Sequence, residues 1–158
     1  MTITFRPYRR PDDFETIGHF ITGLYQPGNA DGNWIEPAWE YMHYHSLLDA
    51  ASLGRIGIWE ENDRIVAVVH YEWSLGEAFF QFDPAFRHLF PALLDYAEAQ
   101  LTGIRRDDGR KYLKAYVNDN APEFQAVVKA RGYLIDPEER HRELQLMCVE
   151  NQPPGPGE

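Results

Sequence analysis

The feature that most constrains the fold is a run of three predicted β-strands in the middle of the chain. Apolar and β-branched residues alternate or cluster there as they do in strands. The polar segment 61–63, Glu-Asn-Asp, indicates a hairpin, and the segment 74–76, Ser-Leu-Gly, indicates a second tight turn. The three strands are expected at residues 56–58, 65–71 and 78–82. Consecutive strands joined by such short turns predict an antiparallel meander.

Helices are predicted before and after this meander from apolar residues that repeat at helical spacing. They are expected at residues 11–24, 37–48, 91–101 and 121–131, with Gly132 as the C-terminal cap of the last. Further strands are expected at residues 2–8, 112–117, 133–135 and 143–149. Residues 102–110 are expected to form a polar loop. The resulting order, β-α-α-β-β-β-α-β-α-β-β, predicts an α/β (α+β) fold with a mixed, mostly antiparallel sheet flanked by helices.

Length and charge limit the classes of protein to consider. A chain of 158 residues suits one domain, which we expect at residues 1–150, followed by a Pro- and Gly-rich tail or linker at 151–158. The net charge of −10 disfavours binding to nucleic acid. The single cysteine, Cys148, fits a reducing compartment, and no apolar run has the length of a signal peptide or a membrane span. These features predict a cytoplasmic protein without membrane contact.

Four segments of the sequence follow one another in this order: FRPY followed by PDD near the N-terminus, GIWEENDRIVAV at residues 57–68, FDPAFR at 82–87 followed by ALL at 92–94, and Asn120 through KARGY at 129–133. Together they resemble the GNAT (Gcn5-related N-acetyltransferase) superfamily. The resemblance extends from about Ile3 to Val149. Taken in order, the four segments are similar to the first strand and helix cap, the hairpin, the strand-to-helix junction and the closing signature of that family.

The resemblance implies an N-acetyltransferase that uses acetyl-CoA, which lies in such proteins between the fourth and fifth strands. The pyrophosphate is held there by backbone N–H groups at the start of the following helix. The matching positions in this chain are Phe82, Arg87, His88, Leu89, Phe90 and Asn120.

The chain departs from the family pattern at two places. Residues 87–92 read Arg-His-Leu-Phe-Pro-Ala, without the glycines that let backbone approach phosphate. Val128 stands where many family members carry the tyrosine that protonates the departing CoA thiolate. Tyr116 or water is a possible substitute for that tyrosine.

Acetyl transfer to an amine requires a base that removes a proton from the amine. Glu77 is the candidate base because it opens the strand expected to line the cofactor cleft; the alternative is a solvated charge at a strand end. His70, on an apolar strand, is interpreted as a structural histidine. His43 and His45 are two residues apart and point in different directions on a helix, so no metal site is expected.

Two functions of different classes follow from the sequence. The first is an N-acetyltransferase that acts on a small-molecule or peptide-like amine. The second is a non-catalytic GNAT-fold lobe that packs against a catalytic one, which the missing glycines, Val128 and the tail at 151–158 favour. Partners are therefore expected to be an amine substrate and a second GNAT lobe or a second copy of the chain.

Overall fold

A computed structural model describes residues 2–28, 32–118 and 121–135. The chain divides into two compact units. Unit 1 comprises Met1–Leu24 and Asn33–Val117, and unit 2 comprises Tyr25–Gly32 and Asn118–Glu158. No helix in the described ranges is long and apolar enough to cross a membrane.

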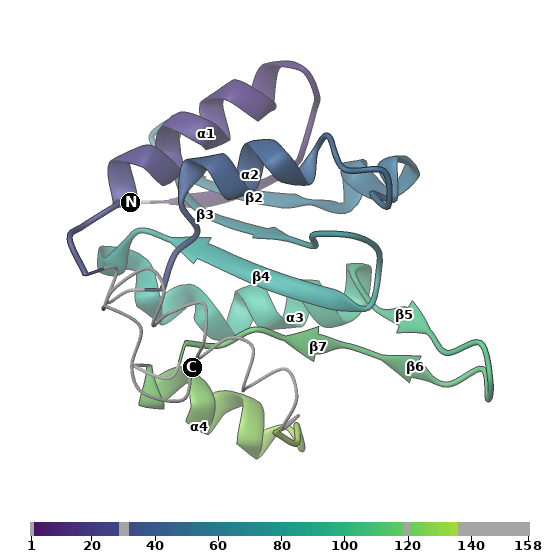
Figure 1. Ribbon diagram of the computed structural model, residues 1–158. Helices are drawn as coiled ribbons and strands as arrows, with labels where there is room; N and C mark the ends of the chain where they lie inside the picture. Colours follow the sequence, from purple (N-terminus) through teal and green to yellow (C-terminus); the bar gives the residue numbers. More distant parts are fainter. Residues whose placement is uncertain (1, 29–31, 119–120, 136–158) are drawn as a thin grey trace, which may run out of the picture. The chain divides into compact units, whose positions relative to one another are not determined.

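The described part of unit 1 contains a five-stranded sheet with the order β1-β2-β3-β4-β7 (Figure 1). The strands are β1 (Ile3–Pro7), β2 (Gly57–Glu61), β3 (Arg64–His70), β4 (Glu77–Phe82) and β7 (Lys114–Ala115). Neighbouring strands from β1 to β4 pair antiparallel, whereas β7 pairs parallel with β4. The mixed, mostly antiparallel sheet predicted from the sequence is confirmed.

The hairpin between β2 and β3 forms at the predicted position. Its two turn residues, Asn62 and Asp63, have positive φ angles of 51° and 61°. This is the conformation of a type I′ turn, which matches the twist of the flanking strands and favours Asn and Asp at these positions. The turn sets the register in which Glu61 lies opposite Arg64.

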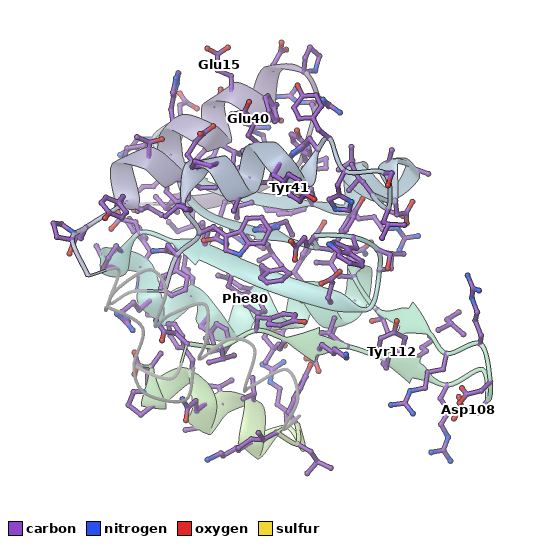
Figure 2. The ribbon with its side chains drawn as sticks, in the orientation of Figure 1. Glu15, Glu40, Tyr41, Phe80, Asp108 and Tyr112 are labelled. Carbon is purple, nitrogen blue, oxygen red and sulfur yellow. The ribbon has the colours of Figure 1, made fainter. Side chains whose placement is uncertain are left out.

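Helices cover both faces of this sheet. One face carries α1 (Asp12–Leu24) and α2 (Glu36–Met42), and the other carries α3 (Phe90–Gln100) (Figure 1). Because successive strand residues point to opposite faces, Phe79 of β4 contacts Trp34, whereas Phe80 contacts Phe90 of α3. Figure 2 shows Phe80 on the α3 side of β4.

The second helix is shorter than predicted: it ends at Met42 and does not reach residue 48. The imidazole Nδ1 of His43 donates to the carbonyl oxygen of Trp39, 2.9 Å away. A continuing helix would use that carbonyl for the backbone N–H of residue 43, which instead bonds to Glu40. A side chain that competes for a backbone carbonyl in this way favours helix termination.

The segment after α3 also differs from the prediction. Residues 102–110 were expected to be a polar loop, but they contain most of a small hairpin of β5 (Gly103–Ile104) and β6 (Lys111–Tyr112). Gly109 has a φ angle of 71° and donates to the carbonyl of Arg105, which closes the turn. The strand predicted at 112–117 is therefore divided between β6 and β7.

In unit 2 the described residues form α4 (Pro122–Ala130). Gly132 has a φ angle of 88°, its N–H donates to Lys129, and Tyr133 donates to Val128. This pair of bonds is the Schellman motif and confirms the predicted cap. The strand predicted at 133–135 is wrong, because these residues follow the cap without strand pairing. The strand predicted at 143–149, with Cys148, and the tail at 151–158 lie outside the described residues.

A partly buried ion pair joins α1 to the first strand. The guanidinium of Arg6 donates to both carboxylate oxygens of Asp13, at 2.7 and 2.8 Å, and to Glu60 at 2.8 Å. The backbone N–H of Arg9 donates to the same carboxylate. Burial acts to raise the pKa of Asp13, but these bonds outweigh it and hold the pKa below its ordinary value of 3.8.

Replacing Asp13 by asparagine is expected to lower the free energy of unfolding by about 2–3 kcal/mol, because it leaves the guanidinium of Arg6 without its bidentate partner. Urea denaturation at neutral pH measures the change. The matched control is Asp12→Asn, on the neighbouring exposed carboxylate, which is expected to change stability by about 0.5 kcal/mol or less. An equal loss in both variants would contradict a specific role for the Arg6–Asp13 pair.

Candidate functional site

The candidate site lies at the edge of β4, where its pairing with β7 stops. The two strands run in the same direction (Figure 1), but only Glu77 and Ala78 of β4 have partners in β7. One further bond follows, from the N–H of Tyr116 to the carbonyl of Ala78. Beyond this point β4 continues to Phe82, so its outer edge is not covered by a described strand.

A side chain occupies the end of this edge. Asn33 donates through Nδ2 to the carbonyl oxygen of Phe82 at 3.2 Å, and its Oδ1 accepts from the N–H of Phe82 at 3.1 Å. Asn33 is buried, with 3% of its surface exposed. A single carboxamide thus supplies the donor and the acceptor that a neighbouring strand would supply.

Trp34, the residue after Asn33, begins a row of hydrogen-bonded polar groups that leads to His70. The N–H of Trp34 donates to Oε1 of Gln81 at 2.6 Å, and Nε2 of Gln81 donates to Nε2 of His70 at 3.1 Å. The proton of His70 is on Nδ1, because that nitrogen contacts the carbonyl of Tyr71, which only accepts. Burial lowers the pKa of His70 to about 4, so the imidazole is neutral.

Aromatic rings line the same face of β4. Phe79 stacks on Tyr116 with a centroid distance of 4.3 Å and an interplanar angle of 4°. The ring of Trp34 contacts the rings of Phe79 and His70, with centroid distances of 4.9 and 4.5 Å. Phe79 therefore lies in an aromatic cluster on the face of β4 toward α2.

The junction between β4 and α3 is a 3₁₀ helix, η2 (Pro84–Leu89), which runs directly into α3. Asp83 caps η2 by accepting from the N–H of Ala85 at 3.0 Å. The N–H of Phe90 donates to the carbonyl of Arg87, and Pro91 has no N–H to offer. At the start of α3, one backbone N–H is therefore already bonded within the chain and another is missing.

The predicted cofactor residues are divided between exposed and buried positions. The guanidinium of Arg87 lies over the ring of Phe82, 5.9 Å from its centroid, and His88 is exposed. Phe90 is 1% exposed and packs on Phe80, and Leu89 is half-buried at the start of α3. Asn120 lies outside the described residues.

The predicted base, Glu77, lies at the first residue of β4. Its Oε1 accepts from the N–H of Trp73 at 3.0 Å and from the N–H of Ser74 at 3.5 Å. The carboxylate thus holds the turn that precedes β4, and it lies at the end of the strand where β7 pairs. Its role as a base stays a prediction.

The two histidines of the α2 region have separate environments. Nε2 of His43 accepts from the hydroxyl of Tyr8 at 2.9 Å, and burial lowers the pKa of His43. Nδ1 of His45 accepts from the N–H of Leu47, and its Nε2 donates to the carbonyl of Glu72. Among the described residues no three His, Cys, Asp or Glu side chains converge as metal ligands.

Sequence reasoning missed the two carboxamides, Asn33 and Gln81, that join the loop before α2 to β4. Asn33 lies in a polar segment that indicates only a loop, and 47 or more positions separate each residue from its partner. Gln81 offered a weak signal, because it is a polar residue between two phenylalanines in a predicted buried strand.

No family model matches the sequence, and no curated protein matches it significantly. Among solved structures, the fold matches the crystal structure of the ribosomal-protein-S18-alanine N-acetyltransferase from Escherichia coli with a TM-score of 0.52. The match covers 83% of this chain and 77% of that chain, at 17% sequence identity. The chain has a GNAT fold. In this fold β4 and β7 are the fourth and fifth strands of the central sheet, and η2 and the start of α3 form the junction that follows the fourth strand.

Proposed function

We propose that the chain is an N-acetyltransferase domain that binds acetyl-CoA at the outer edge of β4 and transfers the acetyl group to an amine. The observation that carries the proposal is the early end of the β4–β7 pairing, after which no described strand pairs with the outer edge of β4 at Phe80 and Phe82. An extended chain of secondary amides, such as the pantetheine arm of CoA, is complementary to such an edge. The GNAT fold supports this assignment.

The chemistry requires an uncharged amine that attacks the thioester carbon. The nitrogen forms a bond to this carbon, the carbon–sulfur bond breaks so that CoA leaves as its thiolate, and a base takes the proton that the nitrogen loses. Glu77 is the proposed base. His70 is unsuited, because it is fully buried and both ring nitrogens already have partners. The acceptor is a small-molecule or peptide-like amine, and the acidic composition and single cysteine support a cytoplasmic setting.

A non-catalytic GNAT lobe is the second candidate function. Asn33 favours it, because its carboxamide occupies the backbone groups of Phe82. The η2–α3 junction favours it too, since Phe90 uses its N–H within the chain and Pro91 has none. Such a lobe would pack beside an active GNAT lobe or a second copy of the chain.

Isothermal titration of the chain with acetyl-CoA separates the two functions. The N-acetyltransferase proposal predicts saturable binding in the micromolar range, and release of free thiol when an amine is supplied. Heat and thermal shift that stay absent at millimolar acetyl-CoA would leave the non-catalytic lobe as the function.

Arg87→Ala is expected to weaken acetyl-CoA binding about tenfold, because Arg87 is the cation at the junction proposed to meet the pyrophosphate. The control is Arg106→Ala, on the exposed β5–β6 hairpin, which is expected to leave the dissociation constant unchanged. Equal affinities of wild type and the Arg87 variant would show that the phosphate lies elsewhere.

A further inference from the structure

The backbone groups of β4 divide between its two edges in a regular way. Asp83 donates to Val66, which places the N–H of Asp83 on the β3 edge, and Ala78 accepts from Tyr116, which places Ala78 on the outer edge. Alternate residues of a strand face the same edge. Phe80 and Phe82 therefore present their N–H and C=O groups outward with Ala78.

The outer edge is closed at Phe82 by a segment that is not a strand. We define the strap as Asn33 and Trp34, which lie just before Ile35, the N-cap of α2. Asn33 takes both backbone groups of Phe82, and Trp34 is held through its N–H by Gln81. Each of these bonds joins a side chain to backbone.

The strap is suited to exchange with a ligand. The carboxamide of Asn33 gives Phe82 one N–H donor and one carbonyl acceptor, a pair that two successive secondary amides of an extended ligand also offer. The energies of the old and new bonds are then similar, since neutral hydrogen bonds of one type replace each other. By contrast, Ala78 is bonded to the backbone of Tyr116, which continues β7.

We propose that the strap is a gate on the edge of β4: Asn33 must release the backbone of Phe82 before an amide-bearing ligand binds there. The inference rests on the proposed function, because it assigns a regulation to the same site. The closed strap reduces the apparent affinity in proportion to the fraction of molecules in which it is open. Asn33 is thus a gating residue and makes no bond to the reacting atoms.

Amide hydrogen exchange of the wild-type chain tests whether the strap opens. The Phe82 amide, bonded to Asn33, is expected to exchange with a protection factor at least about tenfold lower than that of Asp83, bonded to β3. Equal protection of the two amides, at the level of global unfolding, would overturn the gate. This measurement requires neither a ligand nor a variant.

Asn33→Ala then tests what the strap controls. The variant is expected to accelerate exchange at Phe82 relative to Asp83 and to bind acetyl-CoA about tenfold more tightly than wild type. Unchanged or weaker binding, with wild type binding, would show that Asn33 only supports the fold. If the alanine variant does not fold, Asn33→Ser, which shortens the side chain but keeps a polar group, takes its place with the same expectations.

The two proposals fail in different ways. If neither wild type nor the Asn33 variant binds acetyl-CoA, the N-acetyltransferase proposal falls, while the exchange of Phe82 in wild type still decides whether the strap opens. If only the variant binds, the gate is supported and wild type is held closed. Binding by both with equal affinity supports the acetyltransferase and overturns the gate.

Discussion

Replacing Trp39 by alanine is expected to lower the free energy of unfolding by about 3–5 kcal/mol. Trp39 is fully buried, and its indole contacts the rings of Tyr8 and His70 at centroid distances of 5.7 and 5.5 Å. Its Nε1 also donates to the carbonyl of Phe14 at 3.0 Å. The alanine variant removes the largest side chain between α1, α2 and the sheet and leaves that carbonyl without its donor.

Chemical denaturation followed by far-UV circular dichroism measures this loss. The matched control is Tyr41→Ala, near the C-terminal end of the same helix (Figure 2). Tyr41 is 64% exposed. That variant is expected to change the free energy of unfolding by about 0.5 kcal/mol or less. A loss below about 1 kcal/mol for Trp39→Ala would show that the region collapses around the cavity or is not packed as described.

The stability of the protein is expected to fall by about 2–3 kcal/mol between pH 7 and pH 4.5 through His70. Its pKa is lowered from 6.5 to about 4 in the folded state, because the fully buried imidazole cannot be solvated when charged. Below pH 6.5 the unfolded chain takes up the proton and the folded chain does not. Acid therefore favours the unfolded state until the folded imidazole also titrates near pH 4.

Urea denaturation at several pH values between 7 and 4.5 measures this dependence. His70→Gln keeps a neutral group that can bond to Gln81 and is expected to flatten the pH dependence, even where it lowers stability at pH 7. Burial also lowers the pKa of His43. A pH dependence of stability that persists in the His70→Gln variant is therefore attributed to His43. His88→Gln, on an exposed side chain, serves as the control. Identical slopes for wild type and His70→Gln would contradict the buried, neutral state of His70.

Much of the fold was predictable because its elements depend on local patterns. The β2–β3 hairpin follows from Asn62 and Asp63, which adopt positive φ with little strain, and the end of α4 follows from Gly132. The hairpin of β5 and β6 had a local signal as well, since Asp108-Gly109 is a turn sequence. Its strands, however, are only two residues long, too short for the alternation that predicts a strand.

The candidate site was less predictable because its contacts are not local. The sequence indicated the β4–α3 junction and the loss of its glycines, but it offered no reason to connect Asn33 with Phe82. The early end of α2 was missed for a related reason: the His43 side chain that competes for the Trp39 carbonyl bonds through its other nitrogen to Tyr8, 35 positions away.

The sequence by itself therefore determined the class of fold, the meander and the end of α4, because periodicity, turn residues and caps act over a few neighbouring positions. Only the tertiary structure decided where α2 ends, where the β4–β7 pairing ends and which side chain covers the outer edge of β4. The physical reason is that a buried backbone N–H or C=O must find a partner, and that partner is whichever group the assembled fold brings within about 3 Å. At Phe82 that group is the carboxamide of Asn33.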